Sequence, residues 1–448
     1  MIFNLLDVNM KQSKKLLLLL LLFIVAVVHV YSQKIDYTEF SLDNGLHVIL
    51  HKDSGTPIVV VSVMYDVGSK HENPDRTGFA HFFEHLMFEG TKNIGRGEYS
   101  KIVEKAGGIL NANTSFDRTY YYEMLPSNQL ELGLWLESER MLHATVDSIG
   151  IQTQKQVVIE EKKQTMDNVP YGTILNETLK RAFTIHPYRW HVIGDPDHIM
   201  AALDEEFQEF YDKFYAPDNA VLVIAGDIDV NKTKELVSKY FNDIPKGKMK
   251  ESYTKIIEPP LKGEIRDTIF DNVQLPLILQ SYRSPAMNTD DYYAMDMLNT
   301  LLSTGQSSRL YRELVDNQRL ALMVASSPMP FNEPSLNLIM AFPNMGIDPY
   351  ELEKAIDTEV EKVKTQLIPE NEFQKLRNQF ENNIISENQR MATIAHNLAT
   401  NYIYFGDASL INKELEKYMA VTREDIQRVA NEYFRPENRV VLYYMPQN

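Results

Sequence analysis

The chain has 448 residues, 44% hydrophobic and 24% charged, which is too long for one ordinary core and excludes a disordered chain. It contains no cysteine, so disulfides and thiolate metal ligands are excluded and any metal must be held by His, Asp or Glu. The net charge of −17 disfavours nucleic acid and anionic lipid and mildly favours basic ligands.

Residues 1–32 have the pattern of a secretory signal peptide. Three lysines between positions 11 and 15 precede a thirteen-residue apolar run at 16–28, which is shorter than the about 20 residues that span a bilayer. Ser32 is a small residue that suits the position before a cleavage site. We therefore expect export to the periplasm, with 42 basic and 61 acidic side chains after residue 32. The alternative is a retained N-terminal membrane anchor.

Residues 38–69 predict a β-hairpin followed by a buried strand. In "TEFSLDNGLHVILHKD" (38–53), Asn44 and Gly45 lie between two alternating segments, a strong hairpin signal. The apolar run "TPIVVVSVMYDVGS" (56–69) is typical of a buried strand.

A helix with metal-binding potential follows at "HFFEHLMFEGT" (81–91). His81, Glu84 and His85 have the i, i+3, i+4 spacing that places side chains together on a helix. Two imidazoles and an adjacent carboxylate suit Zn²⁺, and the carboxylate is free to take a proton from metal-bound water. This pattern arises by chance in on the order of a few in a hundred such chains. The alternative is a helix whose histidines have structural partners.

A catalytic zinc site needs a third protein ligand and one open position. The segment "TQKQVVIEEKKQTMDN" (153–168) predicts a helix that offers Glu160 and Glu161. Because a helix rotates by about 100° per residue, only one of the two faces the metal.

The segment "FYAPDNAVLVIAGD" (214–227) returns 219 residues later as "YFRPENRVVLYYMP" (433–446). In both copies a helix with apolar spacing leads into a proline-containing turn and an apolar strand. We therefore predict two tandem homologous α+β domains at 33–245 and 264–448, each a mixed sheet with helices packed on it. A Lys-, Pro- and Gly-rich linker is expected at 246–263.

The chain resembles the M16 (pitrilysin or inverzincin) zinc metallopeptidases of the short two-domain type. The motif HxxEH is followed 76 residues later by Glu161 in "VVIEE". The resemblance covers nearly all of the mature chain, and it includes the segments "GGILNANTSFDRTYYYEMLP", "HPYRWHVIG" and "GQSSRLYREL". The resemblance implies that His81, His85 and Glu161 are zinc ligands and that Glu84 is the general base acting on zinc-bound water.

The resemblance also implies substrate contacts. The strand that contains Asn111, Ala112 and Thr114 matches an exposed family edge that pairs with the substrate backbone. Arg309 matches an arginine that helps to bind substrate. An ordinary solvent-facing strand and a salt-bridged helix arginine are the alternatives.

The chain departs from the family at two positions. Gln154 stands where a glutamate commonly lies seven residues before the third ligand; we expect it to support the site by hydrogen bonding, without a negative charge. Leu322 stands where a substrate-binding tyrosine is expected. In the second copy, Asp296, Asn299 and Thr300 occupy the positions of the HxxEH residues, so no zinc site is expected there.

The sequence therefore predicts an exported zinc endopeptidase or oligopeptidase that hydrolyses unfolded peptides. Because the expected substrate clamp is incomplete, we expect a homodimer, or a heterodimer with a related M16-like subunit, that closes as a clamshell. The alternatives are a non-catalytic assembly or chaperone-like subunit and a metal protein without peptidase activity.

Overall fold

The computed structural model describes residues 34–247 and 253–447. From Tyr37 onward they form one compact unit. The predicted signal peptide and part of the predicted linker lie outside the described residues. Within the described part of the chain, no helix has both the length and the apolar character that crossing a bilayer requires.

The first half builds a six-stranded mixed sheet in the order β1-β2-β6-β3-β5-β4. Its strands are β1 (Thr38–Ser41), β2 (His47–Lys52), β3 (Ile58–Tyr65), β4 (Ile109–Thr114), β5 (Thr119–Pro126) and β6 (Ala220–Gly226). β2 and β6 are parallel, and the other neighbours are antiparallel. The predicted hairpin is confirmed, because β1 pairs with β2 across a turn in which Gly45 has a φ of +91°.

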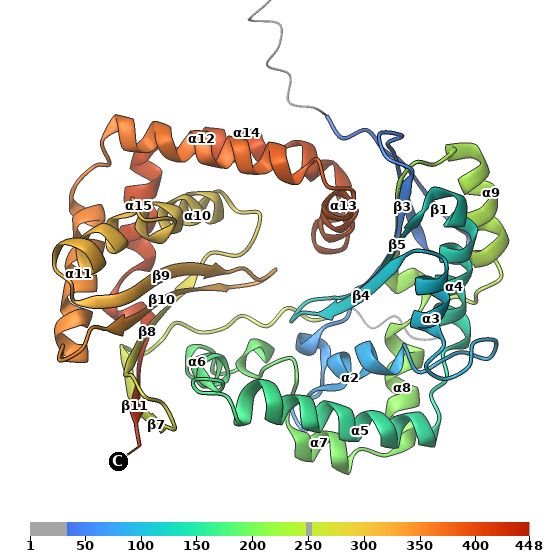
Figure 1. The fold of residues 1–448 in the computed structure, drawn as a ribbon, viewed down its shortest axis with the longest axis horizontal. Coiled ribbons are helices and arrows are strands. Elements are labelled where there is room, and N and C mark those ends of the chain that lie inside the picture. Colours follow the sequence, from blue (N-terminus) through green and yellow to red (C-terminus); the bar gives the residue numbers. More distant parts are fainter. Residues whose placement is uncertain (1–33, 248–252, 448) are drawn as a thin grey trace, which may run out of the picture. The chain divides into compact units, whose positions relative to one another are not determined.

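Helices of the first half cover one face of this sheet, and Figure 1 shows α3, α4 and α9 grouped beside it. The first half as a whole contains α2 (Phe79–Leu86), α3 (Tyr99–Lys105), α4 (Leu130–His143), α5 (Ser148–Lys162), α6 (Ile174–Ala182), α7 (Pro196–Ala201), α8 (Asp204–Phe214) and α9 (Val230–Phe241). Val59, Val61 and Val63 of β3 join the core on this face.

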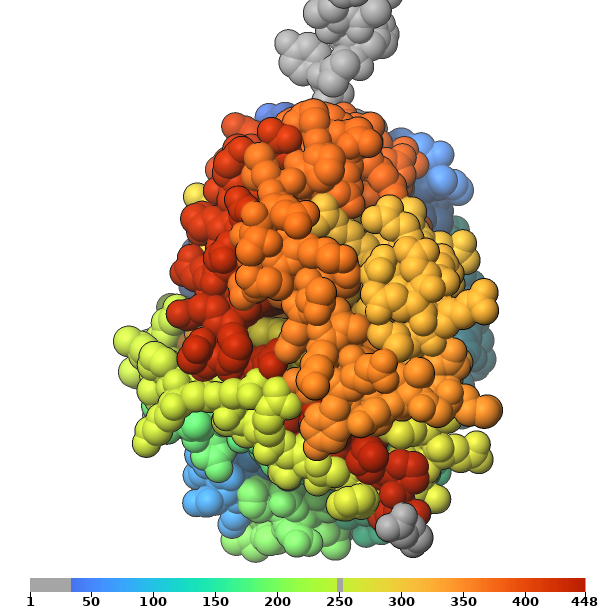
Figure 2. Space-filling model, turned by 90° about the vertical axis from the view of Figure 1, so that its left-hand side faces the viewer, coloured from blue at the N-terminus to red at the C-terminus, as the bar shows by residue number. Residues whose placement is uncertain are grey.

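The second half builds a five-stranded sheet in the order β7-β11-β8-β10-β9. The strands are β7 (Ile265–Asp271), β8 (Leu277–Ser284), β9 (Ala321–Met329), β10 (Ser335–Pro343) and β11 (Arg439–Pro446). The helices are α10 (Asp290–Ser303), α11 (Pro349–Thr365), α12 (Glu370–Glu387), α13 (Met391–Phe405), α14 (Glu414–Ala420) and α15 (Arg423–Tyr433). Figure 2 shows a face formed mostly by this half, in yellow, orange and red.

The structure confirms the α+β class and the internal repeat. Without β1, the first sheet has the same strand order as the second, with one parallel pair at the same place, β2–β6 and β7–β11. The repeated segment forms α8, a turn and β6 in one copy and α15, a turn and β11 in the other. The side-chain amide of Asn219 donates to the carbonyl of Phe214 at the end of α8, and that of Asn438 donates to the carbonyl of Tyr433 at the end of α15. The repeated asparagine therefore closes the same helix–strand corner twice.

Each half also contributes a helix to the other half's sheet. α13 packs on β6 and β3, opposite the face that α4 covers, and its Thr400 contacts Met64 of β3. α6 packs on β11 and β8, where Leu179 joins a cluster with Leu279 and Leu442. Both faces of β3 are therefore covered, which explains why "IVVVSVMY" is apolar without alternation.

Candidate metal centre

α2 carries the HxxEH motif beside its buried stripe. The apolar side chains that anchor the helix in the first core are Phe79, Phe82, Phe83 and Leu86. His81, Glu84 and His85 therefore share the remaining side of the helix, which lies next to α5.

α2 begins at a glycine that lets a second segment approach its backbone. Gly78 has a φ of +96°, in the left-handed region that favours glycine. A Cβ on Gly78 would lie 2.7 Å from the carbonyl oxygen of Ile193, and a Cβ on Gly194 would lie 2.3 Å from the Gly78 nitrogen. The start of the motif helix therefore packs directly against the end of the "HPYRWHVIG" segment.

The buried carboxylate of Glu72 holds the same helix start. It accepts hydrogen bonds from the backbone nitrogens of Gly78 (2.9 Å) and Ala80 (2.8 Å) and from the indole nitrogen of Trp190 (3.2 Å). Burial raises the pKa of Glu72 to about 8, and the N–H donors act in the opposite direction. Glu72 therefore satisfies helix N–H groups that would otherwise lack partners and ties α2 to Trp190.

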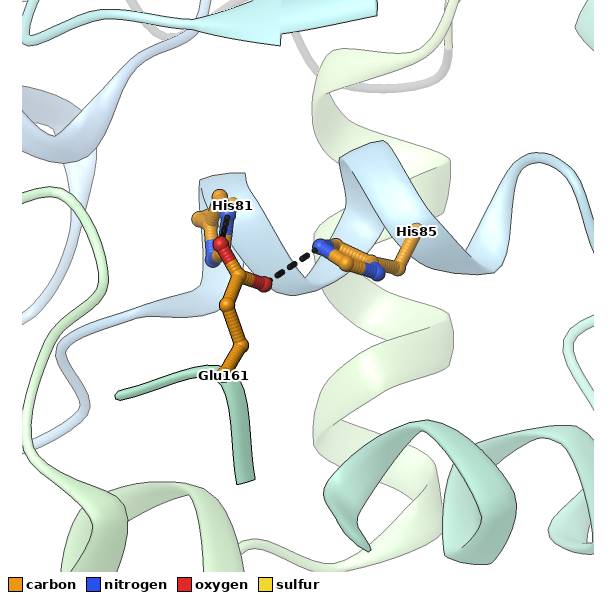
Figure 3. A group of neighbouring side chains, drawn as sticks. All are labelled: His81, His85 and Glu161. Carbon is orange, nitrogen blue, oxygen red and sulfur yellow. Dashed lines mark ion pairs between the residues drawn. The ribbon is translucent and has the colours of Figure 1, made fainter. Parts of the chain in front are cut away.

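α5 brings the third candidate ligand to α2. Figure 3 shows Glu161 reaching from α5 toward both imidazoles of α2. The Glu161 carboxylate places Oε1 3.6 Å from His81 Nε2 and Oε2 3.1 Å from His85 Nε2. Glu160 instead accepts a hydrogen bond from Gln164 and lies 3.7 Å from Lys163 on the exposed side of the helix. Of the two adjacent glutamates, the structure therefore brings Glu161 to the histidines.

The position of α5 is fixed at its N-terminus and at its middle. The Asp147 carboxylate caps its N-terminus by accepting from Gly150 N at 2.7 Å. The Lys155 ammonium donates to the carbonyls of Ala202 (2.7 Å) and Met200 (3.3 Å) at the end of α7. Glu161 lies three residues after the buried Val158, at the end of the inward-facing stripe of α5.

The three side chains fit a zinc ion. One ligand atom from each lies within 4.8 Å of the other two, and this is the one such group of His, Cys, Asp and Glu among residues 34–247 and 253–447. Two imidazole nitrogens and one carboxylate oxygen form a common catalytic zinc donor set that leaves a position open. Burial lowers the pKa of His81 to about 4, and contact with His85 lowers the pKa of Glu161. Both groups are therefore in the metal-binding protonation state near neutral pH.

Glu84 lies on the same helix and is held by β4. The hydroxyl of Thr114 donates to Glu84 Oε2 at 2.6 Å. Burial raises the pKa of the Glu84 carboxyl above its ordinary value. A partly buried carboxylate one turn from His81 and adjacent to His85 has the location and chemistry of a proton acceptor.

The predicted substrate strand is β4, at the edge of the first sheet. Exposed and half-buried residues alternate along it, so Asn111 is exposed while Ala112 and Thr114 are half-buried. The backbone nitrogen of Ala112 donates to its neighbour's side-chain oxygen, Asn111 Oδ1, at 2.9 Å. Thr114, predicted to contact substrate, donates its hydroxyl to Glu84 in this structure.

The remaining predicted site residues have partners away from the two imidazoles. Gln154 Nε2 donates to Glu89 Oε1 at 2.5 Å. Arg309 donates to Glu372 on α12, at 3.2 Å from Nε and 2.6 Å from Nη2, the salt-bridge alternative named from the sequence. Leu322 is 49% exposed on β9.

The matching helix of the second half, α10, is built differently. Asp296 accepts from the Tyr418 hydroxyl at 2.7 Å, and Asn299 donates to the carbonyl of Met295 at 3.0 Å. Neither these residues nor Thr300 belongs to a candidate metal group within the described ranges.

Sequence analysis missed three residues that place the site: Glu72, Gly78 and Gly194. The segment "HPYRWHVIG" pointed only to the family resemblance. In the structure, its Trp190 and Gly194 contact the start of α2. The signal available in the sequence was the pair of distant glycines, Gly78 and Gly194. A glycine indicates that the backbone needs conformational freedom there, but it does not show which segments meet.

Comparisons with known proteins show the family. The family model described as "Insulinase (Peptidase family M16)" matches residues 47–195, and "Peptidase M16 inactive domain" matches residues 204–380. "Zinc protease PqqE" of Helicobacter pylori is 32% identical over 424 residues, 94% of this chain and 95% of that protein. The chain therefore belongs to the M16 peptidase family.

Solved structures give the same result for the fold. The crystal structure of a protease from Helicobacter pylori has a TM-score of 0.87 at 32% identity, covering 92% of this chain and 100% of that one. A peptidase M16 inactive domain from Pseudomonas fluorescens has a TM-score of 0.83, covering 92% and 98%; at 17% identity it supports the fold alone.

Proposed function

We propose that the chain is an exported zinc endopeptidase or oligopeptidase that hydrolyses unfolded peptides. The observation that carries the proposal is the convergence of His81, His85 and Glu161, from two helices, beside the carboxylate of Glu84. The named zinc protease relative supports it. Export is proposed from the signal-like pattern of residues 1–32.

His81, His85 and Glu161 would hold the zinc ion. A bound zinc ion supplies Lewis acidity that polarises a water molecule and a peptide carbonyl. Glu84 accepts the proton of the attacking water, because its carboxylate lies on the same side of α2 as the histidines. Burial favours this acceptance by raising the pKa of the carboxyl, and Glu84 then delivers the proton to the departing amine.

The peptide would add a strand to β4. Among the strands of the described residues, this edge strand pairs only with β5, so Asn111, Ala112 and their neighbours have one side available. Backbone pairing suits peptides of many sequences, because the main chain supplies much of the affinity. The Asn111 side chain, which now accepts from Ala112 N, would give way to a substrate carbonyl. Arg309, engaged with Glu372, would have to release this partner to contact substrate.

We also propose that the active form contains a second chain, either another copy or a related M16-like subunit. The expected tyrosine is replaced by Leu322, and Arg309 is paired with Glu372, so this chain alone offers an incomplete clamp.

The test measures peptide hydrolysis and zinc content of the purified mature protein before and after chelation. The Glu84→Gln variant is measured in the same way. We expect wild type to lose hydrolysis with its zinc and regain it on zinc addition. Glu84→Gln should keep zinc and fold while kcat falls by at least about 100-fold, the usual scale for a general base. Wild-type turnover in Glu84→Gln would remove Glu84 from the role. A zinc-loaded wild type that cleaves no peptide would leave the non-catalytic alternative.

A further inference from the structure

We propose that Thr114 is a positioning residue for Glu84, so that β4 both receives the peptide and orients the proton acceptor. This inference rests on the proposed function. Its central observation is the 2.6 Å hydrogen bond from the Thr114 hydroxyl to Glu84 Oε2. A hydroxyl donating to a carboxylate at this distance forms a charge-assisted bond, stronger than one between neutral groups.

The direction of the Thr114 side chain supports the assignment. Leu110, Ala112 and Thr114 share one face of β4, because side chains alternate along a strand. Leu110 and Ala112 on this face pack against the core that contains α2. The exposed residues Asn111 and Asn113 occupy the opposite face. The Thr114 hydroxyl therefore points toward the motif helix and away from solvent.

Thr114 is also the residue that restrains Glu84. Within the described ranges, the hydrogen bond to the Glu84 carboxylate comes from the Thr114 hydroxyl. A glutamate side chain has several rotatable bonds, and a catalytic group must be held within about 0.5 Å of its productive position. Without the hydroxyl, Glu84 loses the partner that fixes its carboxylate.

The support behind Thr114 is rigid. Thr114 pairs across the hairpin with Thr119, whose buried hydroxyl donates to the carbonyl of Val67 at 2.8 Å. The next residue, Ser115, closes the turn: its backbone nitrogen donates to the carbonyl of Arg118 at 2.8 Å. A β-branched side chain has few χ1 rotamers, so a fixed backbone also fixes the hydroxyl.

The same residue faces the free edge of the strand. Because Ser115 and Arg118 are joined by a ladder hydrogen bond, the next pair, Thr114 and Thr119, directs its backbone N–H and C=O away from the partner strand. A peptide added at this edge would therefore pair with the backbone of the residue that holds Glu84. We infer that peptide binding and orientation of the proton acceptor are coupled through Thr114.

The test compares Thr114→Val, which keeps the shape and removes the hydroxyl, with Thr114→Ser, which restores it. Thr358→Val is the matched control, because Thr358 donates to its own helix on an exposed face of α11. For each variant, kcat, KM, zinc content and melting temperature are measured. The crystallographic position of the Glu84 carboxylate gives a readout that does not depend on activity.

We expect Thr114→Val to lower kcat by about 10-fold or more, the effect of one charge-assisted hydrogen bond, with KM within about twofold. Zinc content should be unchanged and the Glu84 carboxylate displaced. Thr114→Ser should recover most of kcat, and Thr358→Val should match wild type. A higher KM at unchanged kcat would make Thr114 a substrate contact and overturn the proposal. Equal losses of melting temperature and kcat in Thr114→Val and Thr114→Ser would make it a purely structural residue.

The proposed peptidase function and the role of Thr114 are tested by different measurements. If wild type hydrolyses no peptide, the proposed function fails, yet the position of Glu84 in Thr114→Val still decides whether Thr114 orients it. If wild type is active and Glu84 is undisplaced in an equally active Thr114→Val, only this further inference fails.

Discussion

The neutral side chain of Gln154 suits its acidic neighbour, Glu89. Its amide donates to Glu89 Oε1 at 2.5 Å, while Arg96 Nε lies 2.7 Å from Glu89 Oε2. A glutamate at position 154 would place two carboxylates side by side, with one arginine to balance them. The amide of Gln154 avoids this repulsion and joins α5 to Glu89, which follows α2 in the chain. The expected support by hydrogen bonding is thus directed at Glu89 instead of at an imidazole.

At the residue scale, the sequence predicted that His81, Glu84 and His85 share one side of a helix, because helix geometry is local. The spacing of His81, Glu84 and His85 needs nothing beyond 3.6 residues per turn. Glu161 required the family resemblance, since a 100° rotation separates it from Glu160 but does not say which one faces inward. The Thr114–Glu84 hydrogen bond joins residues 30 positions apart. No local pattern predicts which two segments provide such a pair.

At the scale of elements, the packing of α13 depends on one buried imidazole remaining neutral. His396 Nε2 accepts from Arg118 Nη2 at 3.3 Å, and its ring packs edge-on against Tyr120 at 5.1 Å between centroids. Burial, and then the positive charge of Arg118, lowers the pKa of His396 to about 4. The neutral ring is therefore the form that fits between α13 and the first sheet.

The sign of the pH effect follows from this lowered pKa. Below pH 6.5 the unfolded chain binds a proton at this histidine and the folded chain does not, until the pH approaches 4. The contribution of neutral His396 to the free energy of unfolding is therefore complete above pH 6.5. It is lost as the pH falls, by about 2–3 kcal/mol near pH 4. In chelator-treated protein, we expect His396→Gln to be less stable than wild type at pH 7.5 and to lose less stability toward pH 4.5. Urea unfolding at both pH values checks this. Identical pH dependence in the two proteins would contradict it.

Element types and order were predictable where periodicity was strong. The hairpin at β1–β2 and the helix–strand corners at α8–β6 and α15–β11 follow from turn residues and apolar spacing. The cap on α2 was not predictable, because Glu72 lies six and eight residues before the nitrogens it accepts from, across an irregular turn. Sequence signals for helix starts concern the capping position itself, which here is Gly78.

At the scale of the whole molecule, the two halves are interdependent. α6 and α13 each cover the sheet of the other half, and α6 shifted by the 219-residue offset of the repeat falls within α13. A buried ionic cluster joins the halves as well. Lys70 Nζ lies 2.9 Å from Asp117 Oδ1 and 3.5 Å from Glu333 Oε1, and Glu333 also lies 3.0 Å from His186 Nε2. The repeat predicted two similar sheets, but amphipathic helices show only that a face is buried, not against which sheet.

The proposed second chain gives a prediction at this scale. We expect sedimentation of the active protein to show a dimer, and specific activity to fall on dilution as the dimer dissociates. If the partner is a related subunit, the chain alone should be weakly active at every concentration and gain activity when that subunit is added. Full activity that stays constant on dilution of a monomer would contradict the proposal.

The central claim is that Glu161, not its neighbour, completes a zinc site with His81 and His85. Zinc affinity of Glu161→Gln and Glu160→Gln, measured by competition with a chromophoric chelator, tests it most directly, since the two substitutions are chemically identical and one residue apart. We predict one zinc per chain with wild-type affinity in Glu160→Gln. In Glu161→Gln the affinity should fall by more than the about 10–100-fold typical of losing an outer partner. Equal zinc affinity in the two variants would contradict the account.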